Sequence, residues 1–283
     1  MTEAVDPRGH RVAVKQLHAS LVADPEVRRR FGTVGARLTA IDHPHVVRVI
    51  DALDDDGGCV LVSDFLAGGT LRQRAARGVS PEVACAVVLA VASGVERANR
   101  VGVLHRDLKP ENVLFTSTGV VGVSDFGLAD IVSGPRTLAT QDGTVLGAPQ
   151  YMAPELVRSE EPCPASDVYA LATMLYELLA GRLPFVAEDE ALATMARHVR
   201  EAPTDLMDAT RGVAAPIAGV TMRGLAPEPG DRYVSADEFG GALVDAAAQA
   251  WGSGWLRPTG ITVMASQAVT ARLHATNALE AHS

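Results

Sequence analysis

The sequence predicts an α+β fold built from two unequal parts, a small strand-rich part followed by a larger helical part. Before residue 66, short stretches rich in β-branched residues alternate with turn residues, which is typical of strands. The pair Gly68-Gly69 interrupts the chain, and beyond Thr70 the sequence becomes mainly helical in pattern. A chain of 283 residues with 47% hydrophobic residues is large enough to give each part a core.

The small part is predicted to have the order strand, helix, strand, strand. Asp6-Pro7-Arg8-Gly9 has the residue types of a tight turn, so the β-branched stretch after it is expected to belong to a hairpin. Asp24 and Pro25 predict a helix start, because aspartate caps helices and proline fits the first turn. The predicted elements are a strand over residues 11–17, a helix over residues 24–40, and strands over residues 46–53 and 59–65.

The large part is predicted to hold two apolar helices and a short hairpin. Pro81 opens a helix that extends to about residue 99, and Asp167 is expected to start a buried helix over residues 168–179. Residues 113–115 and 120–123 are expected to pair as the hairpin. The expected boundaries are residues 1–67 for the small lobe, 68–250 for the large lobe and 251–283 for a tail. Packing of this tail against the large lobe is the main expectation, and a partner-binding segment is the alternative.

Charge and composition exclude several classes of function. A net charge of -9 with a pI near 5.4 argues against a protein that binds nucleic acid or anionic membranes. The densest basic run, Arg28-Arg29-Arg30, is expected to be the solvated face of a helix. The apolar stretches are too short to span a bilayer, and no secretory signal is visible. Three well-separated cysteines favour free thiols, so a cytoplasmic location is expected.

Two polar clusters on apolar strand-like segments carry the chemistry. The first is His105-Arg106-Asp107-Leu108-Lys109-Pro110-Glu111-Asn112, and the second is Asp125-Phe126-Gly127. Phosphoryl transfer needs such a set: a carboxylate that aligns a hydroxyl, oxygen ligands for Mg²⁺ and a cation near the moving phosphate. The second cluster alone is weak evidence, because Asp and Gly favour turns and Phe fills cores. A turn or a solvated loop, however, does not require His, Arg, Asp, Lys and Asn at these fixed positions, so the eight-residue cluster is the stronger evidence.

In order, spacing and flanking residues, the two clusters resemble those of protein kinases, in particular bacterial (Hanks-type) serine/threonine kinases. The resemblance covers roughly residues 6–248 and implies the bilobal protein-kinase fold. It also implies that Arg232 pairs with Glu155. Of the 25 basic residues only Lys15 and Lys109 are lysines, and both stand where the resemblance implies a lysine that contacts phosphate.

The resemblance implies a role for each residue of the site. Asp107 would orient the substrate hydroxyl and Lys109 would lie near the transferred phosphate, while Arg106 would bind a phosphorylated activation segment. The implied nucleotide-binding residues are Lys15, Asp64, Leu66, Asn112 and Asp125; the implied Mg²⁺ ligands are Asn112 and Asp125, with Mn²⁺ as the alternative metal; and the implied phosphate acceptors are Thr137, Thr140 and Thr144.

Three features depart from the family pattern. Too few residues precede Lys15 for the first strand and the glycine-rich phosphate loop of the small lobe, and two explanations stay open: an upstream coding start that supplies them, or their loss from the protein. Val34 stands where the family has a helix glutamate that pairs with the lysine. We hypothesise that Val34→Glu would raise nucleotide affinity or turnover, and that the free lysine leans toward Asp125. Ala148 stands where the family has a threonine.

The function that the sequence favours is transfer of the ATP γ-phosphate to serine or threonine hydroxyls of proteins, with self-phosphorylation as a further expectation. The four residues that the chemistry needs are all present, although the residues for nucleotide clamping are reduced. A pseudokinase or scaffold that binds partners is therefore the alternative. A small-molecule phosphotransferase fits less well, because the long stretch over residues 125–155 suits a protein substrate.

Overall fold

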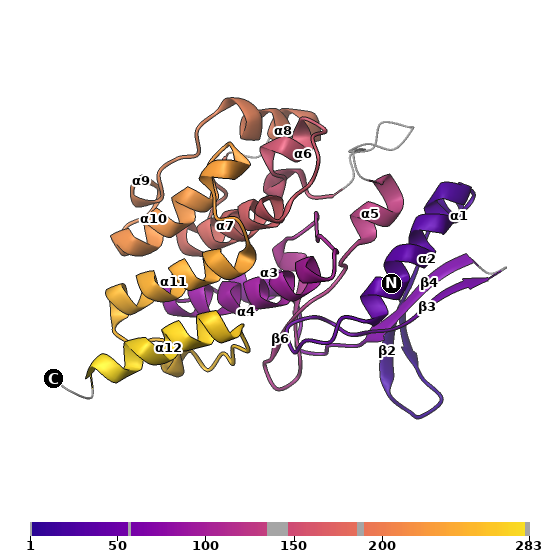
Figure 1. Ribbon diagram of the computed structural model, residues 1–283, viewed down its shortest axis with the longest axis horizontal. Helices are drawn as coiled ribbons and strands as arrows, with labels where there is room; N and C mark the ends of the chain where they lie inside the picture. Colours follow the sequence, from indigo (N-terminus) through magenta and orange to yellow (C-terminus); the bar gives the residue numbers. More distant parts are fainter. Residues whose placement is uncertain (1, 56–57, 135–146, 186–189, 281–283) are drawn as a thin grey trace.

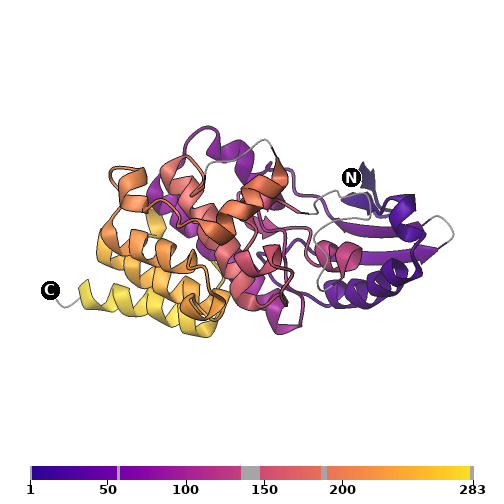
Figure 2. The ribbon, with the colours of Figure 1, turned by 90° about the horizontal axis from the view of Figure 1, so that it is seen from above.

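The computed structural model describes residues 2–55, 58–134, 147–185 and 190–280. These residues form a small strand-rich lobe and a larger helical lobe, as the sequence predicts (Figure 1). Seen from above, the lobes lie next to each other along the long axis, with the two chain ends in different lobes (Figure 2). In the described part of the chain, we find no helix with the length and hydropathy needed to cross a membrane.

The small lobe holds one antiparallel four-stranded sheet with the strand order β1-β2-β4-β3. The predicted hairpin turn is confirmed, because Asp6 Oδ1 accepts hydrogen bonds from the amides of Arg8 and His10, each at 2.8 Å. Gly9 has a φ of 87° at this turn, a conformation that favours glycine. The strands are β1 (Thr2–Val5), β2 (Arg11–Gln16), β3 (Val49–Asp55) and β4 (Gly58–Asp64).

Helix α2 (Pro25–Thr39) packs across this sheet. The short helix α1 (Ala19–Val22) precedes it in the chain. Asp24 caps α2 as predicted, and its side chain accepts a hydrogen bond from the Glu26 amide at 2.8 Å. The helix approaches β3 closely at Gly35, where an added Cβ would stand 2.8 Å from the Cβ of Ala52. This contact explains why a glycine, which weakens helices, lies in the middle of α2.

Strand β3 begins three residues later than predicted, because the residues before it pair with the large lobe. The Val47 amide donates to the Val123 carbonyl at 2.8 Å, and the Val123 amide donates to the His45 carbonyl at 2.9 Å. Val46 and Val123 accordingly form a parallel bridge. The loop between α2 and β3 therefore belongs structurally to both lobes.

Helices α4 (Pro81–Arg100) and α7 (Pro164–Ala180) form the centre of the large lobe, and every residue of α4 from Ala84 to Val95 is buried. Helix α7 begins at Pro164, three residues before the predicted start, since this proline fits the first helical turn. The other elements are α3 (Leu71–Ala75), η1 (Pro110–Asn112), β5 (Val113–Phe115), β6 (Val121–Val123), α5 (Leu128–Ser133), η2 (Pro149–Tyr151), α6 (Pro154–Val157), α8 (Ala191–Arg200), α9 (Leu206–Ala209), α10 (Ala215–Gly224), η3 (Pro229–Asp231) and α11 (Ala236–Trp251).

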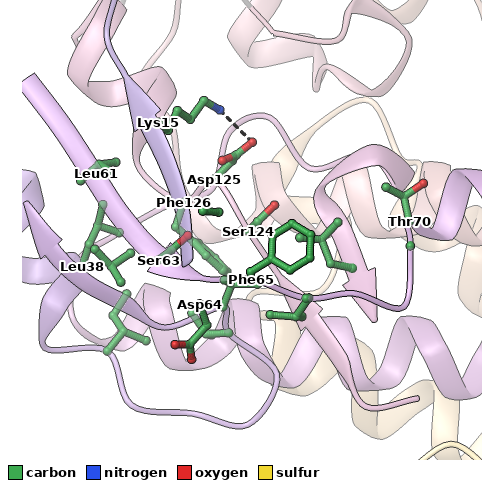
Figure 3. Close-up of a pocket in the computed structure, with 18 of the residues that line it drawn as sticks. Lys15, Leu38, Leu61, Ser63, Asp64, Phe65, Thr70, Ser124, Asp125 and Phe126 are labelled. Atoms are coloured by element: carbon green, nitrogen blue, oxygen red, sulfur yellow. Dashed lines mark ion pairs between the residues drawn. The ribbon is translucent and has the colours of Figure 1, made fainter. Parts of the chain in front are cut away.

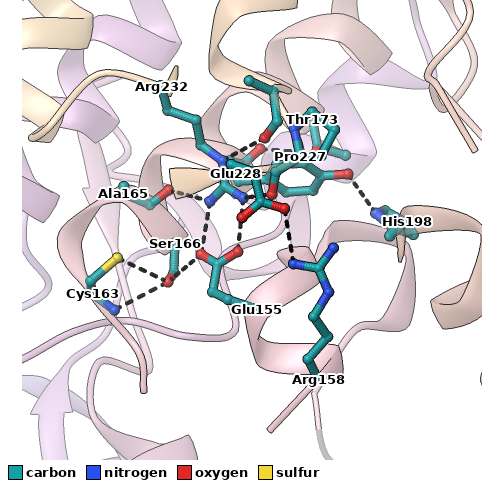
Figure 4. Close-up of polar contacts among 12 residues, drawn as sticks. Glu155, Arg158, Cys163, Ala165, Ser166, Thr173, His198, Pro227, Glu228 and Arg232 are labelled. Carbon is teal, nitrogen blue, oxygen red and sulfur yellow. Dashed lines mark hydrogen bonds and ion pairs between the residues drawn. The ribbon is translucent and has the colours of Figure 1, made fainter. Parts of the chain in front are cut away.

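A buried ion pair between Glu155 and Arg232 ties α6 to the segment after η3, as the resemblance implied (Figure 4). Nη1 and Nη2 of Arg232 each donate to one oxygen of Glu155, at 2.7 and 2.8 Å. The remaining donors reach backbone carbonyls, including those of Ala226 and Ala165. Because the guanidinium and the carboxylate are both well bonded, the pair can stay charged inside the core.

The tail packs on the large lobe, which confirms the main expectation for it. Trp255 and Val269 are each 3% exposed, and helix α12 (Gln267–Glu280) lies alongside α11 (Figure 1). A short helix, η4 (Arg257–Thr259), precedes an extended segment that runs along α4 toward the small lobe. The exact lobe boundaries at residues 67 and 250 remain a prediction.

Candidate active site

The first polar cluster lies on a loop between α4 and β5, and Asp167 of α7 holds this loop. Asp167 accepts hydrogen bonds from the amides of His105 and Arg106, each at 3.0 Å. The His105 ring donates from Nε2 to the Ser124 carbonyl at 2.9 Å, which joins this loop to the second cluster. Burial raises the pKa of Asp167, while His105 and the two amide bonds act in the opposite direction. The start of the loop is thus held both by α7 and by the backbone just before the second cluster.

The carboxylate of Asp107 has one engaged oxygen and one oxygen without a partner. Oδ2 accepts hydrogen bonds from Nζ of Lys109 at 2.8 Å and from Nδ2 of Asn112 at 3.3 Å. Oδ1 is buried and has no hydrogen-bond partner among the described residues. A buried acceptor without a partner is costly and requires an explanation. A substrate hydroxyl that donates to Oδ1 would supply one.

Gly147 borders this free oxygen and opens onto a groove. A Cβ atom added to Gly147 would stand 3.3 Å from Oδ1 of Asp107, so a side chain here would crowd the place of the hydroxyl. The groove next to it has a volume of about 390 Å³ and is lined by Lys109, Pro149 and Leu183, among other residues. A protein chain that presents a hydroxyl to Asp107 could lie in this groove.

Asp125 of the second cluster follows β6 and points toward the small lobe. Its Oδ2 lies 3.0 Å from Nζ of Lys15 on β2, so the lysine leans toward this carboxylate as hypothesised (Figure 3). Asp125 has a φ of 66°, which is uncommon for a residue other than glycine and typical of functional sites. The ring of Phe126 is buried against the His105 ring, with the two centroids 4.6 Å apart. These contacts place Asp125 between the two lobes.

A cavity of about 220 Å³ separates the lobes next to Lys15 and Asp125 (Figure 3). Its walls are mostly apolar, as expected for a flat aromatic ligand, and Lys15 and Asp125 are among the polar residues that line it. From the first hairpin, Ala13 and Lys15 line it. The other lining residues are Leu38, Ile41, Val46, Val47, Val49, Leu61, Ser63, Asp64, Phe65, Leu66, Gly69, Thr70, Gln73, Leu114, Ser124, Asp125 and Phe126.

The segment that joins the lobes offers backbone groups to this cavity. Asp64 and Leu66 both line it, at the end of β4 and just beyond. The Asp64 amide is already engaged, because it donates to the Arg48 carbonyl at 3.0 Å. Within the described chain, neither the amide nor the carbonyl of Leu66 has a backbone partner. Leu66 is therefore the better candidate for a paired hydrogen bond to a nucleotide base.

The predicted metal ligands offer a donor set that fits Mg²⁺. Nδ2 of Asn112 donates to the Asp107 carbonyl at 2.8 Å, which leaves the amide oxygen of Asn112 as an acceptor. Asp125 adds a carboxylate. No group of three or more His, Cys, Asp or Glu side chains in the described ranges could hold a metal by itself. Mg²⁺ often takes one or two protein ligands together with phosphate oxygens and water, and the oxygen donors of these two residues are compatible with that pattern.

Val34 and Lys15 line different cavities, although Val34 was expected to face this lysine. It is 5% exposed and lines a space of about 160 Å³ together with Val103 and Arg106. A Cβ atom added to Gly127 would stand 2.6 Å from Cγ1 of Val34, so this side chain packs against the second cluster. The partner of Lys15 in this structure is Asp125, on the opposite lobe.

Two arginines from different lobes bind the end of α5, directly after the second cluster. Arg106 donates to the Gly134 carbonyl at 2.8 Å and lies 3.4 Å from Asp130. Arg30 of α2 donates to the Ile131 carbonyl at 2.9 Å, so the expectation of a solvated face was wrong for this residue. Positive charge at the C-terminal end of a helix is favourable, which explains both contacts.

The predicted regulatory threonines, Thr137, Thr140 and Thr144, lie outside the described residues, and their role remains a prediction. Ala148 is described and is half-buried against the core. Although it lacks the hydroxyl of the family's threonine, Asp107 and Lys109 still form their direct ion pair.

Sequence reasoning missed several residues that hold the site together. Asp167 was seen only as a helix start, although a lone acid at the head of an apolar helix is a recognisable signal. Arg72 was not singled out at all. It donates to Glu111 at 2.6 Å, to Glu177 at 2.5 Å and to the hydroxyl of Tyr151 at 2.6 Å, beside the groove.

Comparison with known proteins agrees with this geometry. Residues 2–217 match the family model described as Protein kinase domain. Serine/threonine-protein kinase PkaB of Streptomyces coelicolor is 44% identical over 201 residues, which cover 67% of this chain and 47% of that protein. Serine/threonine-protein kinase PknB of Mycobacterium tuberculosis is 34% identical over 248 residues, which cover 85% of this chain and 40% of that protein. This chain thus spans less than half the length of these curated relatives.

Solved structures show the same likeness. The crystal structure of the Mycobacterium tuberculosis PknI kinase domain matches with a TM-score of 0.67 and 30% identity, over 87% of this chain and 89% of that one. The predicted α+β, bilobal fold is therefore confirmed. This chain belongs to the protein kinase domain family.

Proposed function

We propose that this chain is a serine/threonine protein kinase that transfers the γ-phosphate of ATP to protein hydroxyls. The observation that carries the proposal is the divided carboxylate of Asp107, whose Oδ2 is held by Lys109 and Asn112 while Oδ1 lacks a partner among the described residues. This arrangement leaves one oriented acceptor for a substrate hydroxyl. The names of the curated relatives support the same activity.

The reaction needs few steps from the protein. The hydroxyl oxygen forms a bond to the γ-phosphorus, and the bond from that phosphorus to the bridging oxygen of ADP breaks. Asp107 orients the hydroxyl and accepts its proton at Oδ1. Lys109 lies beside this carboxylate and neutralises charge on the transferred group. Mg²⁺, held by Asn112 and Asp125, would supply charge neutralisation on the phosphates, and Mn²⁺ is the alternative metal.

Nucleotide and regulatory residues complete the proposal. Leu66, and Asp64 through its carbonyl, would bind the base in the cavity between the lobes, and Lys15 would contact the phosphates. Protein substrates include the chain itself, with the acceptors Thr137, Thr140 and Thr144. Arg106 would bind the resulting phosphate, which competes with the contacts that it now makes to α5.

A reducing compartment suits this chain. Cys59 and Cys85 are buried and unpaired, and Cys163 is also free. Burial raises the pKa of Cys59 and Cys85, which keeps both as unreactive thiols. We therefore propose that this chain is located in the cytoplasm.

The test is incubation with labelled ATP, Mg²⁺ and a generic basic protein, followed by phosphoamino-acid analysis. We expect phosphoserine or phosphothreonine, and no transfer in excess chelator. Asp107→Asn should lower the rate about 10²- to 10⁴-fold while the melting temperature changes little, because the shape is kept. Phosphotyrosine as the main product, or equal label with Asp107→Asn, would contradict the proposal. Binding of ATP without any transfer would favour the scaffold instead.

A further inference from the structure

An extended segment of the tail docks at the junction between the lobes. Residues 261–266, here called the docking segment, join η4 to α12 and lie outside the part that matches the kinase family. The Met264 amide donates to Nε2 of His45 at 2.8 Å. Its carbonyl accepts from the hydroxyl of Ser93 on α4 at 2.6 Å. Both polar backbone groups of one tail residue are thus bonded to the kinase domain.

His45 is fully buried and uses both ring nitrogens. Its Nδ1 donates to the Val121 carbonyl of β6 at 2.8 Å, and its Nε2 accepts from the docking segment. These two bonds require the neutral ring with the proton on Nδ1, and burial lowers the pKa of His45 in agreement with this state. A single side chain therefore links the tail to β6.

The link continues from His45 to the proposed metal site. The His45 carbonyl accepts from the Val123 amide at 2.9 Å, and the Val47 amide donates to the Val123 carbonyl at 2.8 Å. Val123 is the last residue of β6, two positions before Asp125. The loop over residues 45–47 is therefore the direct neighbour of the strand that carries Asp125.

Helix α4 supports this loop from the other side. A Cβ atom added to Gly94 would stand 2.5 Å from the His45 carbonyl oxygen, so the helix and the loop meet backbone to backbone. The loop is thus enclosed by α4, β6 and the docking segment. Of these three neighbours, the docking segment is the one most distant from the loop in the sequence, and it contacts the loop through the His45 ring.

We propose that the docking segment positions Asp125, acting through His45 and strand β6, so that the tail is a working part of the nucleotide and metal site. This inference rests on the proposed kinase function for its catalytic consequence. The residue that would contact the metal is Asp125, and His45 is a positioning residue. A merely structural cover would stabilise the domain without affecting how the site binds Mg²⁺ and ATP.

The sharpest test removes the backbone donor that binds His45. Met264→Pro eliminates the amide donor to His45 and leaves the His45 side chain in place. Because the Met264 side chain is 52% exposed, its loss should matter little, and Met264→Ala controls for it. Thr262→Pro is the matched proline control, since the Thr262 amide has no hydrogen-bond partner in the described part of the tail.

We expect Met264→Pro to raise the dissociation constant of a Mg²⁺-bound ATP analogue about three- to tenfold, as loss of a buried hydrogen bond would. Hydrogen exchange should speed up in peptides that cover residues 121–127. For the kinase reaction, KM for Mg²⁺-ATP should rise while KM for the protein substrate stays the same. Met264→Ala and Thr262→Pro should behave as the unchanged protein.

Measurements are made at least 10 °C below the melting temperature of each variant, so that loss of fold is not mistaken for loss of positioning. A lower melting temperature with unchanged analogue affinity and unchanged exchange at residues 121–127 would overturn the proposal. Equal effects of Met264→Pro and Thr262→Pro would do so as well. If the unchanged protein transfers no phosphate while the binding and exchange effects appear, the proposed function fails and the positioning role stands.

Discussion

Nζ of Lys15 lies 3.0 Å from Oδ2 of Asp125, so the predicted phosphate-binding lysine forms an ion pair with the predicted metal ligand. The side chains are 35% and 26% exposed, respectively. Solvent screens such a pair, and its contribution is about 0.2–1 kcal/mol. A bound nucleotide and metal can therefore separate the two groups at small cost, after which each is available to a phosphate or a cation.

Lys15→Met should strengthen metal binding in the absence of nucleotide, because the ammonium no longer competes for Asp125. We expect Mn²⁺ to bind about two- to fivefold more tightly, in line with the small energy of a screened pair. Titration followed by electron paramagnetic resonance measures this affinity. Asp125→Asn is the control and should abolish the gain. Weaker Mn²⁺ binding by Lys15→Met would show that the lysine helps to form the metal site.

Val34→Glu should not improve nucleotide affinity in this arrangement, contrary to the hypothesis from the sequence. Val34 packs against Gly127 and lines the cavity with Val103 and Arg106, away from Lys15. A glutamate there would bury a carboxylate in partly apolar surroundings, and we expect a loss of about 1–3 kcal/mol in the free energy of unfolding.

The measurement is ATP-analogue affinity in a cycle of Val34→Glu with and without Lys15→Met. Val34→Gln controls for size and shape. A gain in affinity that disappears with Lys15→Met would mean that α2 turns to bring residue 34 to the lysine. That outcome would restore the original hypothesis.

Arg232→Met should lower the free energy of unfolding by about 3–5 kcal/mol, because it leaves the Glu155 carboxylate buried without its partner. Burial alone would raise the pKa of Glu155, but hydrogen bonds from Arg232 and Ser166 lower it. Urea unfolding measures the change. Glu228→Gln, which breaks the exposed pair with Arg158, should cost less than about 1 kcal/mol. Equal losses in the two variants would contradict this account of the buried pair.

Local sequence rules predicted the parts of the fold that depend on neighbouring residues. The hairpin turn at Asp6 and the helix cap at Asp24 each follow from hydrogen bonds within a few positions. The first polar cluster could be recognised for a similar reason, since its residues are close in the sequence and their types are fixed by the chemistry.

Contacts between distant segments could not be predicted in the same way. The His45 ring accepts a hydrogen bond from an amide 219 positions away, and no sequence pattern near His45 predicts a contact with the tail. Arg30 stands in a basic run that is usually solvated, yet it binds α5 across the lobes. The start of β3 was misplaced because Val46 and Val47 satisfy β rules equally well in either sheet. Tertiary pairing decided each of these cases.

The stability of the domain should fall as the pH drops from about 6.5 toward 4, in part because of His43. Burial, together with His45 and Arg97, lowers the pKa of His43 to about 4. In the folded protein its Nδ1 accepts the His45 amide at 3.1 Å, which a protonated ring cannot do. The unfolded chain therefore binds a proton at higher pH than the folded chain, and this favours unfolding in acid.

The stabilisation from His43 is fully present above pH 6.5 and is lost as the pH falls through the window down to about 4. His43→Asn keeps an acceptor for the His45 amide but cannot be protonated, so it should be less sensitive to acid. We expect its stability relative to the unchanged protein to improve by about 1–2 kcal/mol between pH 7 and 4.5, after allowance for the partial exposure of His43. Urea unfolding at four pH values measures this difference. Because both proteins have the same carboxylates, the effect of carboxylate titration cancels when the two are compared. Parallel curves for the two proteins would show that His43 does not titrate on unfolding.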